Sequence, residues 1–244
     1  LPKIGWPIAE LAGALPPGPR WRILDVGAGL GTTTLGVAAL AARHGIERLE
    51  VTAVDSDAAA LDIFSALAHG GYDLGLCPPI ELDARRDDLE RLDIPRLPQA
   101  DLVLVGFALN ELYRDRDPDD RADAAERMVR RLLGRVAPGG ALIVIEPALK
   151  ETSRALQVLR GRLPEHVYAP CLREGDCPLL RKERDWCHAM LPLELPAKLA
   201  KVARAAGLRQ ERLTFSYLTL RPDGRRLGGH GEPDTVRVVG GPVA

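Results

Sequence analysis

A glycine-rich loop follows a short apolar run near the start of the 244-residue chain. Residues 23–31 read Ile-Leu-Asp-Val-Gly-Ala-Gly-Leu-Gly, and residues 32–43 have helical spacing. Glycines at the end of a strand let the backbone turn sharply and approach a ligand closely, and they leave the N-terminus of the next helix free. Asp55 ends the next apolar run, where a carboxylate can accept both hydroxyls of a ribose. This pattern predicts a site for a nucleoside-containing cofactor.

The spacing of the glycines separates two classes of cofactor. Gly27, Gly29 and Gly31 complete Gly-x-Gly-x-Gly, whereas dinucleotide-binding folds use Gly-x-Gly-x-x-Gly. Asp25, two residues before the first glycine, is also not part of the dinucleotide fingerprint. The loop therefore favours S-adenosylmethionine over NAD, with a dehydrogenase or a purely structural turn as the alternatives.

Asn110 and Glu111 come just past the fourth expected strand, the apolar run at residues 101–107. Substrate chemistry in sheets of this kind takes place beyond the carboxyl ends of the strands. An amide there can orient a target amine or ring nitrogen, and a carboxylate can act as a base or hold the amino acid end of the cofactor. The alternative is that both residues only cap a loop. Methyl transfer from a sulfonium depends on positioning and in-line approach, so no protein nucleophile is needed.

Three of the four cysteines lie in one Pro-containing segment. Cys171, Cys177 and Cys187 are within 17 residues of each other, and thiolates bind zinc or iron–sulfur clusters. Their spacing is not the Cys-x-x-Cys of a zinc ribbon, and three ligands are one short of a closed site. Cys77 precedes the third expected strand, toward the opposite edge of the sheet. We predict a metal centre on the three cysteines, with unconnected thiols as the alternative.

Alternating strands and helices must position these residues. We expect helices over residues 7–15, 32–43, 57–68, 119–136 and 195–206, and strands over residues 22–26, 49–54, 79–82, 101–107, 141–145, 212–220 and 235–239. This order predicts an α/β fold with a doubly wound, mostly parallel, seven-stranded Rossmann-like sheet. The cofactor-binding core would span residues 1–162, a cysteine-containing insertion residues 163–192, and a C-terminal helix with antiparallel strands residues 193–244.

Charge is distributed unevenly along the chain. Residues 1–150 carry 17 basic and 23 acidic side chains, a net charge of −6, whereas residues 151–244 carry 16 and 11, a net charge of +5. A basic half can bind nucleic acid. Arg181, Lys182 and Arg184 adjoin the cysteines, and Arg221, Arg225 and Arg226 lie on an expected hairpin. They either line one groove or are each paired with a nearby acid. With no apolar run long enough for a bilayer and no signal peptide, we expect no membrane partner and a cytoplasmic protein.

Residues 21–147 resemble the class I methyltransferases. The family's motifs correspond to residues 24–31, Val54-Asp55-Ser56, Leu82-Asp83-Ala84, residues 106–112, and the turn Pro138-Gly139-Gly140 with the strand after it. The resemblance implies that S-adenosylmethionine contacts Asp25, Gly27, Ala28, Gly29, Gly31, Asp55, Ser56, Asp83, Ala84 and Phe107.

A narrower resemblance comes from the second half of the chain. The blocks Ala-Pro-Cys at Cys171, Cys-Pro-Leu at Cys177 and Asp-Trp-Cys-His at Cys187 are similar to the bacterial and mitochondrial small-ribosomal-subunit methyltransferase-like family, as are residues 108–112 and 215–218. The resemblance implies a partner in the small ribosomal subunit or its RNA, and a four-iron cluster in place of the less favoured zinc. The last cluster cysteine of that family follows a segment similar to residues 236–243, so the fourth ligand is not evident in this chain.

Three functions follow in order of preference. The first is methylation of ribosomal RNA, with Asn110 and Glu111 at the site of transfer. The second is a ribosome assembly or binding factor that keeps the cofactor fold without turnover. The third is a small-molecule methyltransferase, which would need neither the cysteine segment nor the basic half to enclose its substrate.

Overall fold

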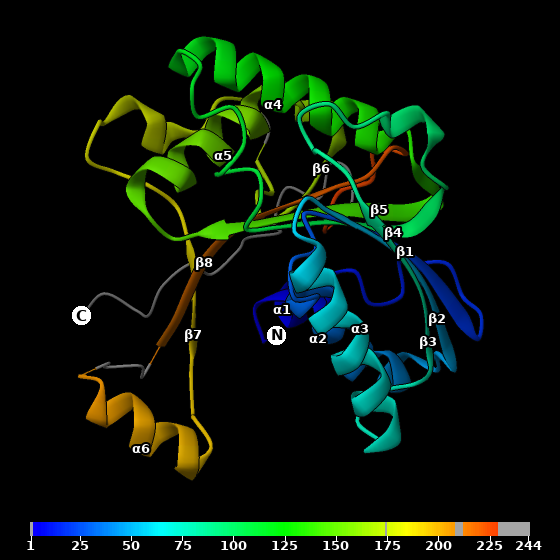
Figure 1. Ribbon diagram of the computed structural model, residues 1–244. Coiled ribbons are helices and arrows are strands. Elements are labelled where there is room, and N and C mark those ends of the chain that lie inside the picture. The colour runs from blue at the N-terminus through cyan, green and yellow to red at the C-terminus, as the bar shows by residue number, and fades with distance from the viewer. Residues whose placement is uncertain (1, 174, 208–211, 229–244) are drawn as a thin grey trace.

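The computed structural model describes residues 2–173, 175–207 and 212–228. Its centre is an eight-stranded sheet with the order β3-β2-β1-β4-β5-β8-β6, in which β7 also pairs with β8. Figure 1 shows α4 and α5 on one face of this sheet and α1, α2 and α3 on the other. The arrangement confirms the doubly wound, three-layer α/β fold expected from the alternation of strands and helices.

The strands are β1 (Arg20–Val26), β2 (Arg48–Asp55), β3 (Ile80–Arg86), β4 (Ala100–Gly106), β5 (Val136–Pro147), β6 (Val167–Ala169), β7 (Ala189–Pro192) and β8 (Arg212–Leu220). The α-helices are α1 (Pro2–Glu10), α2 (Thr32–Ala41), α3 (Ala58–Asp73), α4 (Pro118–Leu133), α5 (Lys150–Arg162) and α6 (Ala197–Ala205). Four short 3-10 helices are η1 (Ala42–His44), η2 (Ile94–Arg96), η3 (Pro164–His166) and η4 (Pro178–Arg181). No helix in the described ranges is long and apolar enough to cross a bilayer.

Pairing along the sheet is parallel from β3 to β5. Strand β1 pairs in parallel with β2 and β4, and β2 pairs in parallel with β3. Strand β8 runs antiparallel to β5, with Glu146 opposite Ser216. The expected number of strands was seven, and the structure has eight in the described ranges. The expected strand at residues 235–239 lies outside those ranges, whereas β6 and β7 were missed because three or four residues are too few to show a periodic pattern.

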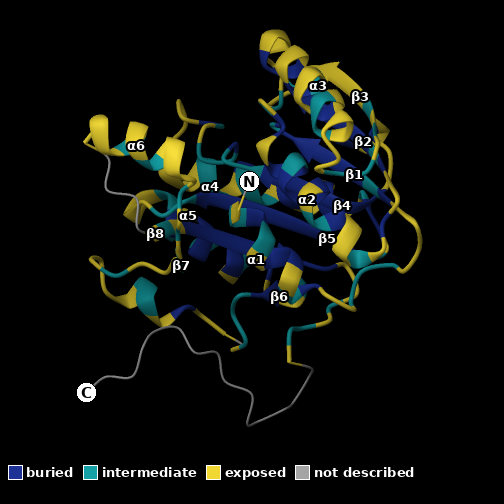
Figure 2. Ribbon diagram, turned by 90° about the horizontal axis from the view of Figure 1, so that it is seen from below, coloured by how far each residue is buried: buried dark blue, intermediate teal, exposed yellow. Residues whose placement is uncertain are grey.

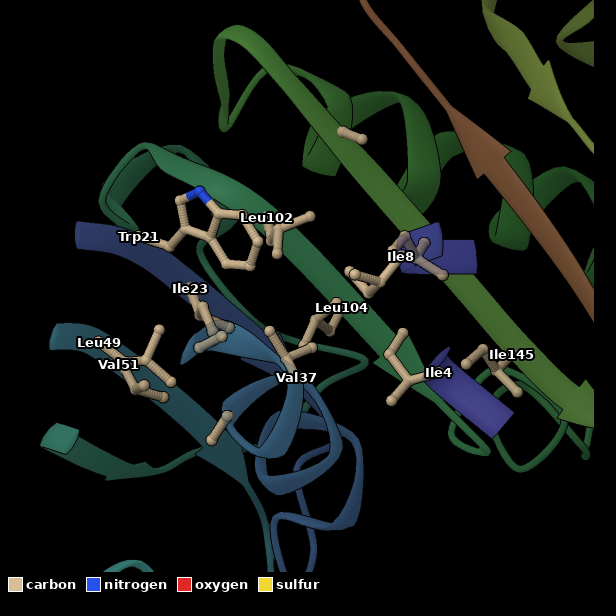
Figure 3. Close-up of a cluster of buried hydrophobic side chains, with 14 of the residues drawn as sticks. Ile4, Ile8, Trp21, Ile23, Val37, Leu49, Val51, Leu102, Leu104 and Ile145 are labelled. Carbon is tan, nitrogen blue, oxygen red and sulfur yellow. The ribbon is translucent and has the colours of Figure 1, made fainter. Parts of the chain in front are cut away.

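Two hydrophobic cores lie on the two faces of the sheet. Alternate residues of each central strand point to opposite faces, so Ile23 contributes to the core under α1 and α2 while Leu24 contributes to the core under α4 and α5. Figure 3 shows the first of these cores, where Ile4 and Ile8 of α1 and Val37 of α2 meet the side chains of β1, β2, β4 and β5. Strands buried on both faces have continuous apolar sequences, and this is why they were predicted from the sequence.

The outer edge of β8 is divided between two short strands. Strand β7 pairs with residues 212–215 of β8, and β6 pairs with Thr219 and Leu220. The segment that connects β6 to β7, residues 170–188, therefore leaves the edge of β8 and returns to the same edge. The hydroxyl of Ser216 donates to the carbonyl oxygen of Cys187 at 3.0 Å, which ties the end of the segment to β8.

Several expected element boundaries differ from those observed. The N-terminal helix covers residues 2–10 instead of 7–15, because Ile4, Ile8 and Leu11 are the residues buried at helical spacing. Strand β3 extends beyond the expected residues 79–82, to Arg86. Its second half is polar because β3 is an edge strand, so the apolar pattern that predicted it ended too early. Helix α5 was not predicted. The predicted cap of α3 is confirmed, since the Asp57 side chain accepts from Ala59 N at 2.9 Å and from Ala60 N at 3.1 Å.

Helix α6 differs from the other α-helices in that none of its residues is buried. It lies at the end of the β7–β8 arm, apart from the two helix layers (Figure 1). Figure 2 shows it mostly in the colour of exposed residues.

Candidate functional site

The glycine-rich loop lies at the carboxyl edge of the sheet, between β1 and α2. The amides of Gly27 and Ala28 both donate to Val54 O, at 2.8 and 3.2 Å, which holds the loop against the end of β2. Gly31 caps α2 in the left-handed conformation, with φ 70°. The loop therefore presents the free N-terminus of α2 at the same edge as the end of β2, as the sequence predicted.

Asp55 links the loop to the start of α3. Its Oδ2 accepts from Gly29 N at 2.8 Å, and its Oδ1 accepts from Asp57 N at 2.9 Å. The carboxylate is partly exposed, so free lone pairs on both oxygens can still face a ligand. Asp55 thus both shapes the loop and offers acceptors beside it. Ser56, the next residue, is exposed at the same edge.

Two of the glycines show why the loop excludes side chains. Gly27 has φ 76°, and a Cβ there would lie 2.3 Å from Ala108 Cβ, because the loop packs against the end of β4. Gly29 has φ 49°, but a Cβ there would meet nothing within 4 Å. Gly27 is therefore required by packing, whereas Gly29 is a left-handed position that faces open space, as a ligand cradle requires.

Asp25 lies fully buried beneath the loop. Its Oδ2 accepts from Thr34 Oγ1 at 2.6 Å, and its Oδ1 has no hydrogen-bond partner among the described residues. Burial raises the pKa of Asp25 to about 6, although the hydrogen bonds from Thr34 act in the opposite direction. Buried polar atoms in folded proteins nearly always have a partner, so this oxygen calls for a bound water, an ion or a proton of its own.

Phe107 forms a turn at the end of β4 in a conformation that non-glycine residues rarely adopt. Its φ is 60°, and its amide donates to Ile145 O at 2.8 Å. Lys3 of α1 lies over the ring, with Nζ 4.5 Å from the centroid, and burial lowers the pKa of this lysine. Strained backbone of this kind is concentrated at functional sites. Helix α1 therefore forms part of the site, which the sequence did not indicate.

Asn110 is held by a buried carboxylate at the end of β5. Glu146 is 2% exposed, and its Oε1 accepts from Asn110 N at 3.3 Å. In the amide orientation that satisfies both groups, the Asn110 side-chain nitrogen donates to Glu146 Oε2 at 2.8 Å and to Phe107 O at 3.0 Å. Burial raises the pKa of Glu146 to about 8, against the backbone hydrogen bonds from Asn110 and Leu109. The side-chain oxygen of Asn110 is then the atom left for a substrate.

Glu111 lies on the same loop but in a different environment from Asn110. It is exposed, and its amide donates to Ala108 O at 2.9 Å. Its negative charge is one of the influences that raise the pKa of Glu146. The structure thus brings Asn110, Glu111 and Glu146 together, and Glu146 is the member that sequence reasoning missed.

Asp83 and Ala84 lie within β3, before its carboxyl end. Asp83 is opposite Thr52, whereas the end of β3 brings Arg86 opposite Asp55. The exposed Asp83 side chain accepts from Arg85, with Nη2 at 2.6 Å. The residues at the level of Asp55 are instead Arg86 and Asp87, since Asp87 N donates to Asp55 O at 3.0 Å. The structure therefore does not bring Asp83 and Ala84 to the edge that carries the glycine-rich loop.

The three clustered cysteines occupy different environments in the segment between β6 and β7. Cys177 is buried and accepts from Gln157 Nε2 at 3.0 Å, Cys171 is half-buried against the α4–α5 core, and Cys187 is exposed. In the described ranges, no group of three histidine, cysteine or acidic side chains is arranged to hold a metal ion. The arrangement of the thiols in this structure does not fit a cluster.

One face of α5 organises the same segment. Arg160, which is buried, donates to the carbonyls of Arg173 and Gly175. Gln157 lies three residues before Arg160 and donates to Cys177 Sγ. Arg154 lies three residues earlier still and donates to carbonyls farther along the segment, such as that of Asp185. Residues spaced in this way share one side of a helix. A row of donors on α5 therefore fixes the backbone path of the cysteine segment.

The basic residues of the C-terminal half separate into two groups. Arg221 is fully buried, and its guanidinium forms a bidentate ion pair with Asp223 at 3.0 and 2.6 Å. Arg225 also pairs with Asp223, at 3.7 Å, and Arg226 donates to Pro164 O. Of the two alternatives that the sequence left open, pairing with a nearby acid holds for Arg221 and Arg225, and the buried Arg221 does not lie on a face open to phosphate. Arg181, Lys182 and Arg184 are exposed.

Comparisons with known proteins agree with this architecture. A family model described as mitochondrial small ribosomal subunit Rsm22 matches residues 8–240. Among curated proteins, no sequence matches the chain significantly.

Solved structures with a similar fold include a putative class I S-adenosylmethionine-dependent methyltransferase from Listeria monocytogenes, with a TM-score of 0.50, 15% identity, and coverage of 96% of this chain and 67% of that chain. A putative methyltransferase from Thermoplasma acidophilum has a TM-score of 0.50 and 16% identity, with coverage of 87% and 72%. Magnesium protoporphyrin IX methyltransferase from Synechocystis PCC 6803, solved with S-adenosylmethionine, has a TM-score of 0.48 and 16% identity, with coverage of 90% and 76%. The first two likenesses show the class I methyltransferase fold.

Proposed function

The chain belongs to the mitochondrial small ribosomal subunit Rsm22 family, and on that premise we propose that it binds S-adenosylmethionine and methylates RNA of the small ribosomal subunit. The observation that carries the proposal is the clamp between Asp55 and Gly29 N at the carboxyl edge of the sheet. The clamp joins an acceptor for ribose hydroxyls to a glycine that faces open space. Both belong to one preformed surface, as a cofactor site requires.

The polar groups beneath and beside the loop fit the two ends of this cofactor. Asp55 would accept from the ribose, and Asp25, which is buried beneath the loop, would favour a positively charged group of the cofactor on the loop above it. When bound, the cofactor supplies a sulfonium-activated methyl group. The chain's own part would be to orient the acceptor, for which the side-chain oxygen of Asn110 is fixed by Glu146 and Phe107 O.

Replacing the carboxylate at the end of β2 tests the cofactor site. Asp55→Ala should weaken binding of S-adenosylmethionine by about 1–3 kcal/mol, because a charged hydrogen-bond partner is removed. Titration calorimetry of the wild type and the variant measures the effect. Asp57→Ala is the matched control, since it removes the cap of α3 two residues away and should cost stability without a comparable loss of affinity. Equal affinities of Asp55→Ala and wild type would contradict the proposal.

A second candidate is an assembly factor that binds the cofactor without turnover. The observation in its favour is that both amide protons of Asn110 are engaged by Glu146 and Phe107 O, which leaves no side-chain donor on Asn110 for a substrate. Radiolabelled methyl transfer to small-subunit RNA separates the two candidates. Binding of cofactor and RNA with no transfer would favour the assembly factor.

We further propose a metal centre on Cys171, Cys177 and Cys187, supported by their clustering in one segment and by a Cys-Pro step at Cys177. The thiols would have to come together from the positions described above. Full-length protein prepared without oxygen should contain iron and sulfide, and each Cys→Ser change in this set should lower the iron content. Cys77→Ser is the control and should not. Metal-free protein whose melting temperature is unchanged in all three variants would contradict the centre.

A further inference from the structure

Three cations surround one open hollow between the start of α5 and the residues that follow η4. Lys150, Lys182 and Arg184 line it together with Glu183. All three cations are exposed, and none forms an ion pair within the described residues. Exposed arginines elsewhere, such as Arg225, do pair with acids. The hollow thus carries three positive charges against the one negative charge of Glu183, a net charge of +2.

Helix α5 fixes the backbone that carries Lys182 and Arg184. Arg154 of α5 donates to the carbonyl oxygens of Leu179, Leu180, Lys182 and Asp185, at 3.4, 3.3, 2.9 and 2.8 Å. A single planar guanidinium therefore gathers four carbonyls of one loop. The side chains of Lys182 and Arg184 are presented from a defined backbone, which lowers the entropy lost when they bind a partner.

An aromatic pair follows directly after the cations. The Trp186 side chain is 37% exposed, and its ring lies 6.3 Å from that of His188 with an angle of 30° between the planes. Trp186 follows Arg184 by two residues on the same loop. An exposed indole on a loop with unpaired cations is a combination with which proteins bind single-stranded nucleic acid, since bases stack on the ring while the cations contact phosphates. An acidic protein partner would use the cations but would have no base to stack.

The surface adjoins the candidate site. The carbonyl of Cys187, next to Trp186, accepts from Ser216, and Ser216 lies opposite Glu146 in the sheet. Glu146 in turn holds Asn110. A strand of RNA on this surface would therefore lie next to the edge of the sheet at which Asn110 is held.

We infer that residues 178–188, with Lys150, form a docking surface for single-stranded RNA, in which Lys150, Lys182 and Arg184 bind phosphates and Trp186 stacks on a base. The inference deepens the proposed function and rests on it. This docking surface is more specific than a general attraction of RNA to the basic half of the chain. It places the RNA contacts on one loop and Lys150, and it does not include the buried Arg221.

The double variant Lys182→Glu/Arg184→Glu tests the phosphate contacts. Binding to an oligouridylate of about 12 nucleotides should weaken at least tenfold, and the slope of log affinity against log salt should become shallower by about 0.7 for each phosphate that the protein no longer neutralises. The control is Arg91→Glu/Arg96→Glu, which makes the same change of charge at two highly exposed arginines in the acidic half of the chain and should leave the slope unchanged. Thermal melting of both double variants establishes that they remain folded.

The stacking interaction has its own measurement. In a Trp6→Phe background, where the buried Trp21 is the other indole, RNA should quench the tryptophan fluorescence, and Trp186→Leu should remove this quenching. Trp186→Leu should also weaken binding by about 5- to 150-fold. Wild-type binding with an unchanged slope in the double variant would overturn the inference. Displacement of RNA by polyglutamate of equal charge, without quenching, would assign the surface to an acidic protein instead. If wild type binds S-adenosylmethionine but not RNA, the docking surface and the RNA partner both fail while the cofactor site stands.

Discussion

Arg221→Ala should lower the free energy of unfolding by about 2–4 kcal/mol, slightly below the roughly 3–5 kcal/mol for removing one partner of a fully buried ion pair, because Asp223 is partly solvated. The Arg221 guanidinium is fully buried and also donates to Ala14 O at 3.0 Å, so it joins the end of β8 to the turn after α1. Its bidentate contact holds the pKa of Asp223 below its usual range. Removing Arg221 leaves the carboxylate, which is one-third exposed, without its main counter-charge. Urea denaturation followed by circular dichroism measures the change.

The control for this variant contacts the same carboxylate from the surface. Arg225 pairs with Asp223 at 3.7 Å and is 71% exposed, so Arg225→Ala should change stability by less than about 1 kcal/mol. The double variant Arg221→Ala/Asp223→Ala should be less destabilised than the sum of its parts, because each single change already breaks the pair. Equal effects of Arg221→Ala and Arg225→Ala would show that burial of the ion pair is unimportant for the fold.

Glu146→Gln should make the stability of the protein much less dependent on pH. In the folded protein, burial raises the pKa of Glu146 from 4.5 to about 8, so between these values the folded state holds a proton that the unfolded state has released. The free energy of unfolding should therefore fall as pH rises through that window. We expect wild type to lose about 2–4 kcal/mol more than the variant between pH 5 and pH 9. Asp25 contributes a smaller loss of the same sign at lower pH.

The neighbouring exposed carboxylate provides the comparison. Glu111→Gln removes a charge from the same loop, but that side chain is exposed. Burial, and not the charge of Glu111, is the largest cause of the raised pKa of Glu146, so the slope of stability with pH should fall only slightly below that of wild type. The measurement is a series of urea denaturations at fixed ionic strength. Parallel curves for wild type and Glu146→Gln would mean that Glu146 is ionised in the folded protein throughout, and that Asn110 is held by a carboxylate instead of a carboxylic acid.

The features that were predicted from the sequence are those set by local pattern. The glycine-rich loop, the cap at Asp57 and the strands buried on both faces each depend on residues adjacent in the chain. Strand β8 was predicted at residues 212–220, although its expected partner at 235–239 lies outside the described residues. Short-range rules of turns, caps and burial were sufficient to place the loop and Asp55 at one edge of the sheet.

The features that were not predicted depend on pairing between distant segments. Glu146 appears in the sequence as an acid after an apolar strand, and only the loop after β4 buries it and changes its pKa. The register of β3 on β2 carries Asp83 away from the carboxyl edge. Arg221 is one basic residue among many until the fold encloses it. The sequence did single out Arg181, Lys182 and Arg184, but only three-dimensional contacts show that Arg221 and Arg225 are already paired with an acid.

The division of the outer edge of β8 between β6 and β7 gives the chain a place where new sequence can be accommodated. Both ends of residues 170–188 are anchored by pairing to one strand, so an excursion of a different length would leave the sheet intact. Closing a longer loop is inexpensive, about 0.6 kcal/mol for each doubling of its length. The core and the segment can therefore diverge at different rates. Relatives that recognise different partners can therefore differ in the length and sequence of this segment, while Gly27 and Asp55 keep the cofactor loop unchanged.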